Sequence, residues 1–107
     1  MAVMSLFHSK DELEGPYLGY SYPISHDWTT EEVTMVVHFF VSVEEAYEKG
    51  VKRDRLMADY RNFKEVIPSK SEEKQIFREF EKRSGYSAYR VVKTMLEQPE
   101  QKVIRME

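Results

Sequence analysis

Helix start and stop signals divide most of this chain into four segments of helical length. At the first start, Thr29 and Glu32 have the spacing of a capping box: the threonine hydroxyl can accept from the third helical N–H while the glutamate reaches back. Trp28 and Val33 occupy the two hydrophobic-staple positions around this cap. Gly50 supplies a left-handed stop. The pattern therefore predicts a long first helix that ends just before Gly50.

The apolar residues of this first helix form two stripes. One stripe follows helical spacing, and the second adds Met35 and Phe39. The first stripe consists of Val33, Val36, Val37, Phe40, Val43 and Tyr47. A helix that is apolar on two sides is expected at the centre of a fold. Because three further short helices are few to cover both sides, the pattern also favours self-association of the chain.

Three shorter helices are predicted after the first. The second runs from about Arg53 to Ile67, where Pro68 ends it. The third follows Ser69-Lys70-Ser71-Glu72, a second capping-box pattern, and ends at Ser84-Gly85. The fourth begins after Ser87 and ends at Gln98-Pro99. Each has an apolar inner face, composed of Leu56, Met57, Tyr60, Phe63 and Ile67, then Ile76, Phe77 and Phe80, then Val91, Val92, Met95 and Leu96.

The two ends of the chain are predicted to be extended. Residues 20–24 contain Tyr22 directly before Pro23, a position that avoids helical geometry, and the tyrosines here can lie over a helical core as a strap. Residues 102–106 alternate apolar and polar side chains, which favours a short extended tail against the helices. Residues 1–19 are a weakly patterned N-terminal extension. We therefore expect residues 20–107 to form one all-α domain, a compact irregular array of four helices.

Composition excludes several classes of protein. The chain has no cysteine, which removes disulfides, thiol nucleophiles and cysteine-based metal sites and fits a reducing cytoplasm. The N-terminus does not resemble a signal peptide. The longest apolar stretch, Val33 to Val43, falls short of the roughly 20 residues that span a bilayer. We expect a cytoplasmic protein that is not associated with a membrane.

Residue patterns indicate no catalytic, cofactor or metal site. The three histidines (His8, His26 and His38) lack metal-binding spacing, and a lone helical residue such as His38 is more commonly a core or boundary residue. The acidic pairs Glu44/Glu45 and Glu72/Glu73 point about 100° apart on a helix, so we interpret them as caps and solvent-exposed faces rather than acid–base pairs. The sequence therefore predicts no enzyme and no small-molecule substrate.

Several sequence blocks occur in an order that resembles one known family. The blocks are Tyr22-Pro23, Asp27 to Glu32, Val37 to Phe40, Ala46 to Gly50, Phe63 to Lys70 and Ser84 to Ser87. Together they look like the YktA-like uncharacterised protein family of low-GC Gram-positive bacteria, over about Tyr20 to Met106. The resemblance implies a small all-helical array and a cytoplasmic protein. It supplies no activity, substrate or catalytic residue.

Charge is unevenly divided along the chain. Residues 1–50 contain two Lys or Arg against nine Asp or Glu, whereas residues 51–107 contain 14 against ten. The interpretation that we favour is that acidic and basic faces complement each other, within the fold or across a dimer. The alternative is an anionic partner for the basic half.

The basic half contains the candidate interaction residues. The segment from Lys74 to Leu96 resembles a helix-turn-helix, with Ser87, Tyr89, Arg90 and Lys93 near the start of its second helix. Glu81 departs from that pattern, since such motifs usually pack a small residue there. Our leading hypothesis is a non-enzymatic protein-interaction or regulatory module. The alternative is a nucleic-acid-associated protein that uses this segment.

Overall fold

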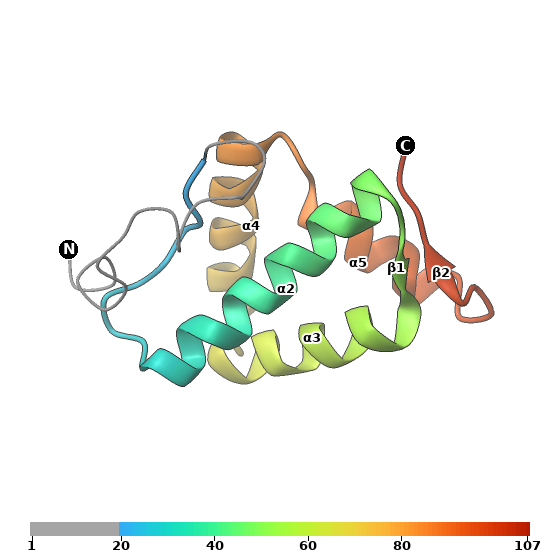
Figure 1. Cartoon of the computed structure of the whole chain (residues 1–107). Coiled ribbons are helices and arrows are strands. Elements are labelled where there is room, and N and C mark those ends of the chain that lie inside the picture. Colours follow the sequence, from blue (N-terminus) through green and yellow to red (C-terminus); the bar gives the residue numbers. More distant parts are fainter. Residues whose placement is uncertain (1–19) are drawn as a thin grey trace.

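The computed structural model describes residues 20–107 and confirms the predicted four-helix fold. The elements in chain order are α2 (Thr30–Glu48), β1 (Val51–Lys52), α3 (Arg53–Val66), α4 (Lys70–Ser84), α5 (Ala88–Glu97) and β2 (Val103–Ile104). Helix α2 crosses the molecule diagonally, with α3 beneath it and α4 and α5 behind it (Figure 1). The prediction of an N-terminal extension at residues 1–19 lies outside the described residues.

The predicted helix boundaries are formed by the expected contacts. At the start of α2, the Thr29 hydroxyl accepts from the Glu32 N–H at 3.1 Å, and the Glu32 carboxylate accepts from the Thr29 N–H at 2.9 Å. Gly50 has a φ of +94° and donates its N–H to the Glu45 carbonyl. Ser69 caps α4 by accepting from the Glu72 N–H, which is one of the two hydrogen bonds of the predicted capping box. These contacts satisfy backbone groups that a helix end leaves unpaired, so the sequence sets these boundaries locally.

The core lies between α2 and the other three helices and contains residues of both stripes of α2. Phe39 and Phe40 are each fully buried. The Phe39 ring packs against Phe63 of α3, with centroids 4.7 Å apart, and the Phe40 ring stacks on Phe80 of α4 at 4.3 Å. A single chain therefore buries residues on both apolar sides of α2, while Met35 of the second stripe stays partly exposed. The oligomeric state stays a prediction.

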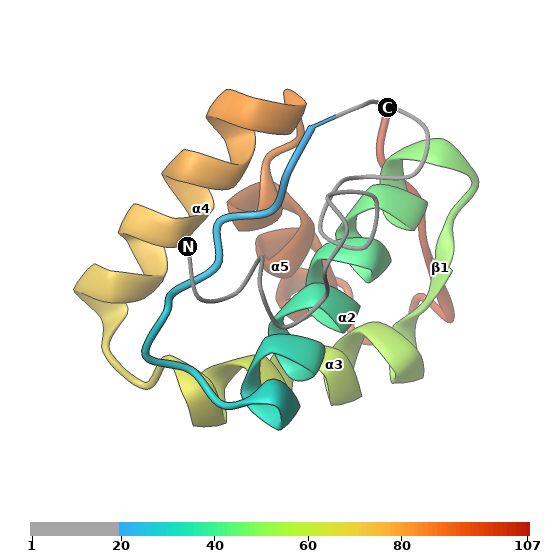
Figure 2. The ribbon, with the colours of Figure 1, turned by 60° about the vertical axis from the view of Figure 1, so that its left-hand side comes forward.

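The predicted strap is present and runs between α2 and α4 (Figure 2). Tyr22 is 3% exposed, and its ring stacks on both Phe40 and Phe80. Arg83, near the end of α4, donates to the carbonyl of Ser21 at 3.2 Å and to that of Tyr22 at 3.1 Å. The strap is thus held by aromatic packing on one side and by an arginine on the other.

Glu44 fastens the strap to α2. The carboxylate accepts hydrogen bonds from the hydroxyls of both Tyr20 and Tyr22, the latter at 2.9 Å. Burial raises the pKa of Glu44, against the lowering effect of the two hydroxyl donors. Burial and the Glu44 carboxylate also raise the pKa values of both tyrosines. The expectation that Glu44 lies on a solvent-exposed acidic face is therefore wrong, because the strap covers it.

The C-terminal tail is extended, as predicted, and forms a small sheet that the sequence did not predict. Strand β2 pairs antiparallel with β1, in the register that places Val51 opposite Ile104. The Met106 N–H donates to the Ala46 carbonyl at 2.8 Å, and the side chains of Ile104 and Met106 are buried. The tail therefore closes one end of the core. No helix within residues 20–107 is long and apolar enough to cross a membrane.

Candidate functional site

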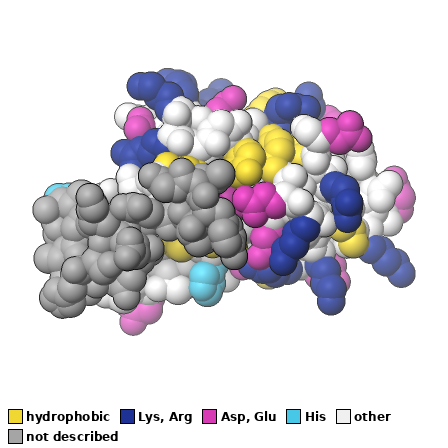
Figure 3. Space-filling model, turned by 45° about the horizontal axis from the view of Figure 1, so that its top comes forward, with side chains coloured by type: hydrophobic (Ala, Val, Ile, Leu, Met, Phe, Trp, Pro, Cys, Tyr) yellow, Lys and Arg dark blue, Asp and Glu magenta, His cyan; other side chains and the backbone are white. Residues whose placement is uncertain are grey.

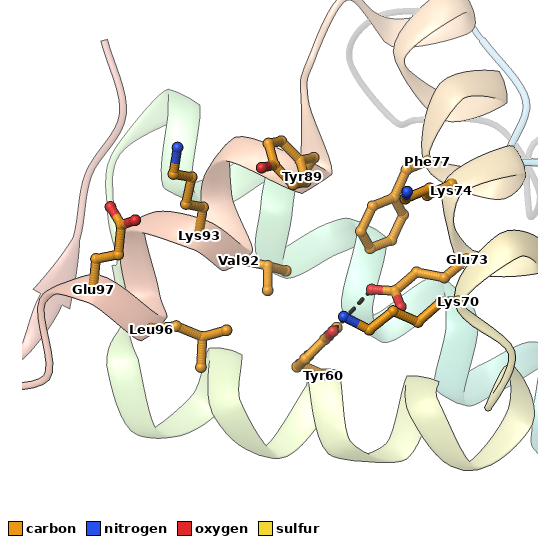
Figure 4. Close-up of a pocket in the computed structure, with 10 residues that line it drawn as sticks. All are labelled: Tyr60, Lys70, Glu73, Lys74, Phe77, Tyr89, Val92, Lys93, Leu96 and Glu97. Carbon is orange, nitrogen blue, oxygen red and sulfur yellow. Dashed lines mark hydrogen bonds between the residues drawn. The ribbon is translucent and has the colours of Figure 1, made fainter.

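Helices α3, α4 and α5 enclose a pocket of about 270 Å³. Figure 4 shows side chains of α4 on one side, those of α5 on the other and Tyr60 of α3 between them. Half of the lining residues are apolar or aromatic, and the other half are charged. It consists of Tyr60, Lys70, Glu73, Lys74, Phe77, Tyr89, Val92, Lys93, Leu96 and Glu97.

The α5 wall of this pocket presents apolar side chains to solvent. Tyr89 is 59% exposed and Leu96 is 56% exposed, whereas Val92 between them is buried. These three residues are spaced i, i+3 and i+7, which places them along one face of α5. Ser87 begins the helix by accepting from the Arg90 N–H at 3.1 Å, a cap that satisfies one backbone N–H of its first turn.

The α4 wall contains a buried carboxylate that is fully engaged. Glu73 accepts from the Tyr60 hydroxyl at 2.8 Å and from the Lys64 ammonium at 2.6 Å. Burial and the neighbouring Glu73 carboxylate raise the pKa of Tyr60 above its usual range. The interpretation of Glu73 as part of a solvent-exposed face is therefore wrong, because α3 supplies both of its partners. With its charge offset by Lys64, Glu73 adds little negative field to the pocket.

Three lysines line the pocket and form no ion pair within residues 20–107. Lys70 and Lys74 lie on α4 and Lys93 lies on α5. Lys70 and Lys74 are one turn apart, a spacing at which like charges destabilise a helix. Lys70 also lies in the first turn of α4, where the helix dipole disfavours a cation. Neither effect stabilises α4, so helix stability does not explain why lysines occupy positions 70 and 74.

Two of the four candidate interaction residues line the pocket and two do not. Tyr89 and Lys93 line the pocket. Arg90 is exposed but does not line it. Ser87 is 9% exposed, and its backbone N–H and carbonyl both contact the Tyr47 hydroxyl, in addition to the cap contact of its side chain. Ser87 therefore belongs to the framework that positions α5 and is removed from the candidate interaction surface.

Few ion pairs connect the acidic first half of the described chain with its basic second half. One ion pair joins the acidic first half to the basic second half within the described residues, between Glu45 and Arg55 at 2.7 Å. Figure 3 shows acidic and basic side chains interspersed on the face that it presents, with apolar side chains exposed among them. Acidic and basic side chains thus do not separate into two faces in this view.

Within residues 20–107, the remaining candidate groups do not assemble into a second site, and His8 lies outside the described residues. His38 lies on the exposed side of α2. Among residues 20–107, no group of three or more His, Asp or Glu residues is placed to hold a metal ion.

Fold and pocket together define a small helical domain with an apolar pocket between three helices and lysines around it. Its sequence places it in a family: the chain belongs to the uncharacterised protein family UPF0223, whose sequence profile matches residues 19–104. This confirms the resemblance stated from the sequence blocks.

Relatives in this family come from several low-GC Gram-positive bacteria. A UPF0223 protein of Lysinibacillus sphaericus is 55% identical over 87 residues, which are 81% of this chain and 92% of the relative. One of Bacillus pumilus is 54% identical over 81% of this chain and 98% of its own length. One of Staphylococcus epidermidis is 48% identical over 77% of this chain and 89% of its own length. These relatives therefore correspond to most of the chain.

Proposed function

We propose that this protein is a non-enzymatic cytoplasmic interaction or regulatory module, and that the pocket between α3, α4 and α5 receives side chains of a protein partner. The observation that carries the proposal is the exposure of Tyr89 and Leu96 beside an apolar recess. Exposed aromatic and aliphatic side chains at the edge of a pocket are typical of protein-binding surfaces.

The size of the pocket supports a protein partner over a small molecule. A volume of about 270 Å³ lies just below the range of roughly 300 to 1,000 Å³ that holds cofactors and drug-sized ligands. One or two apolar side chains from a partner would fill it. The one buried carboxylate in the lining, Glu73, is already bonded to Tyr60 and Lys64, an arrangement suited to holding α3 and α4 together.

Site-specific cross-linking tests this proposal. A photoreactive amino acid replaces Tyr89 or Leu96 in the full chain, and a control carries it at Glu81, an exposed α4 residue outside the pocket lining. We expect one adduct of the same mass from positions 89 and 96 in cells, and none of that mass from position 81. The absence of such an adduct, or equal yields at all three positions, contradicts the proposal.

A second candidate function is nucleic-acid association through the segment from Lys74 to Leu96. The observation that favours it is the exposure of both Arg90 and Lys93 on α5, directly after the short turn from α4. The test is a salt titration of fluorescent duplex and single-stranded nucleic acid, with Arg90→Glu/Lys93→Glu as the variant. Binding through these residues weakens steeply with salt and is lost in the variant. Binding that survives the double substitution excludes this segment.

A further inference from the structure

We propose that the occupant of the pocket is an acidic amphipathic helix of a partner protein. Its apolar side chains would enter the pocket, and its carboxylates would pair with Lys70, Lys74 and Lys93. This inference rests on the proposed function and specifies the chemistry of the partner.

Charge complementarity supports an acidic occupant. Lys70 and Lys74 approach the pocket from one wall and Lys93 from the other, and Glu97 is the single lining carboxylate without a salt bridge within residues 20–107. A bound segment with carboxylates on both of its edges could contact lysines on both walls. Such contacts would also relieve the repulsion between the two α4 lysines, which lie one turn apart.

The shape of the α5 wall supports a helical occupant. The residues Tyr89, Val92 and Leu96 follow the spacing i, i+3 and i+7, which extends over about 10 Å at 1.5 Å per residue. A helix laid against this wall can contact it with apolar residues at a similar spacing over two turns, as helices do when they bind in grooves. An extended peptide would advance about 10 Å in only three residues and would place alternate side chains away from the wall.

The same features disfavour two other occupants. A second copy of this chain, packed with twofold symmetry on the same surface, would bring the three lysines of each copy near those of the other, and such like-charge contacts oppose association. A membrane surface is flat and favours protruding apolar side chains, whereas Val92 and Phe77 are buried at the base of a recess. A segment of a partner protein can enter a recess that a bilayer cannot.

A panel of helical peptides tests the inference directly. The three peptides, of about four turns each, share one apolar pattern at i, i+3 and i+7 and differ only in their polar positions, which are Glu, Gln or Lys. Fluorescence anisotropy measures their affinity for the full chain at low and high salt. We expect the Glu peptide to bind at least about tenfold more tightly than the Gln peptide, since three partly exposed ion pairs each contribute a few-fold.

Matched variants locate the binding. Lys74→Glu/Lys93→Glu should weaken the Glu peptide at least about tenfold and improve binding of the Lys peptide, whereas Lys82→Glu, on α4 outside the pocket lining, should leave affinity unchanged. Leu96→Ser should weaken the binding of all three peptides by a similar factor. Far-ultraviolet circular dichroism of each variant establishes that the fold is retained.

Each result decides between the possibilities. Equal affinity for the Glu and Gln peptides, or binding of none up to millimolar concentration, overturns the acidic-helix inference. Concentration-dependent dimers that Leu96→Ser abolishes, or binding to anionic vesicles that Leu96→Ser abolishes, likewise overturn it. The cross-links from positions 89 and 96 are a separate measurement. If they form while the peptide panel fails, the proposed function stands and only the acidic helix is wrong.

Discussion

Replacing Tyr22 with phenylalanine isolates the polar half of the contact that fastens the strap. The ring stacks on Phe40 and Phe80 remain possible, but the buried Glu44 carboxylate keeps only the Tyr20 hydroxyl as a donor. A hydrogen bond to a charged group contributes about 1.5 to 3 kcal/mol. We therefore expect Tyr22→Phe to lower the free energy of unfolding by about 2 kcal/mol at pH 7.

The same substitution has a predictable effect at alkaline pH. Burial and the Glu44 carboxylate raise the pKa of the Tyr22 hydroxyl above its unfolded value of about 10. The stability that this group contributes is complete below about pH 10 and is lost as the pH rises toward the folded pKa, because only the unfolded chain releases the proton. The loss is about 1.4 kcal/mol per pH unit for one group. Tyr22→Phe should remove that part of the alkaline slope.

Urea denaturation followed by circular dichroism at pH 7, 10 and 11 measures both effects. The matched control is Tyr89→Phe, whose hydroxyl is exposed and forms no hydrogen bond within residues 20–107. This control should match the wild type at every pH. If Tyr22→Phe also matches the wild type at pH 7 and in its loss of stability from pH 10 to 11, the assignment of the strap contact is refuted.

Substitutions at three further sites test how the fold is held, each by urea denaturation. Gly85→Ala should cost about 1 to 2 kcal/mol because Gly85 has a φ of +82°, and Gly85→Asn should cost less; equal costs would contradict a backbone origin. Thr29→Ala should lower the free energy of unfolding by about 1 kcal/mol through loss of the α2 cap. If Thr29→Ala costs as much in a Glu32→Ala background as in the wild type, the two side chains do not form a reciprocal capping box. Phe63→Ala should cost about 3 to 5 kcal/mol because the side chain is fully buried among aromatic rings; a cost below 1 kcal/mol would contradict that packing.

Part of the candidate site was predictable from one stretch of sequence. Tyr89 and Lys93 lie on α5, and the local pattern after Ser87 singled them out. Lys70 and Tyr60 were not connected with them, since they belong to α4 and α3. Which helices surround a pocket depends on how the helices pack, and no spacing within one helix specifies that.

Two buried glutamates show more clearly what the sequence could not predict. Glu44 follows Phe40 by four residues, and Glu73 precedes Phe77 by four, so helical spacing does place each on an apolar face. That signal was available, but a glutamate in such a position is equally consistent with a boundary that faces water. The partners that bury Glu44 are about 22 to 24 residues away in the sequence.

The sequence by itself determined where the helices of this protein begin and end, because the caps and stops at positions such as Thr29, Gly50 and Ser87 act on backbone groups within a few residues. The tertiary structure decided which polar groups are buried and which lysines share a pocket. Those outcomes depend on contacts between distant segments, whose geometry is set only when the strap and the four helices pack together.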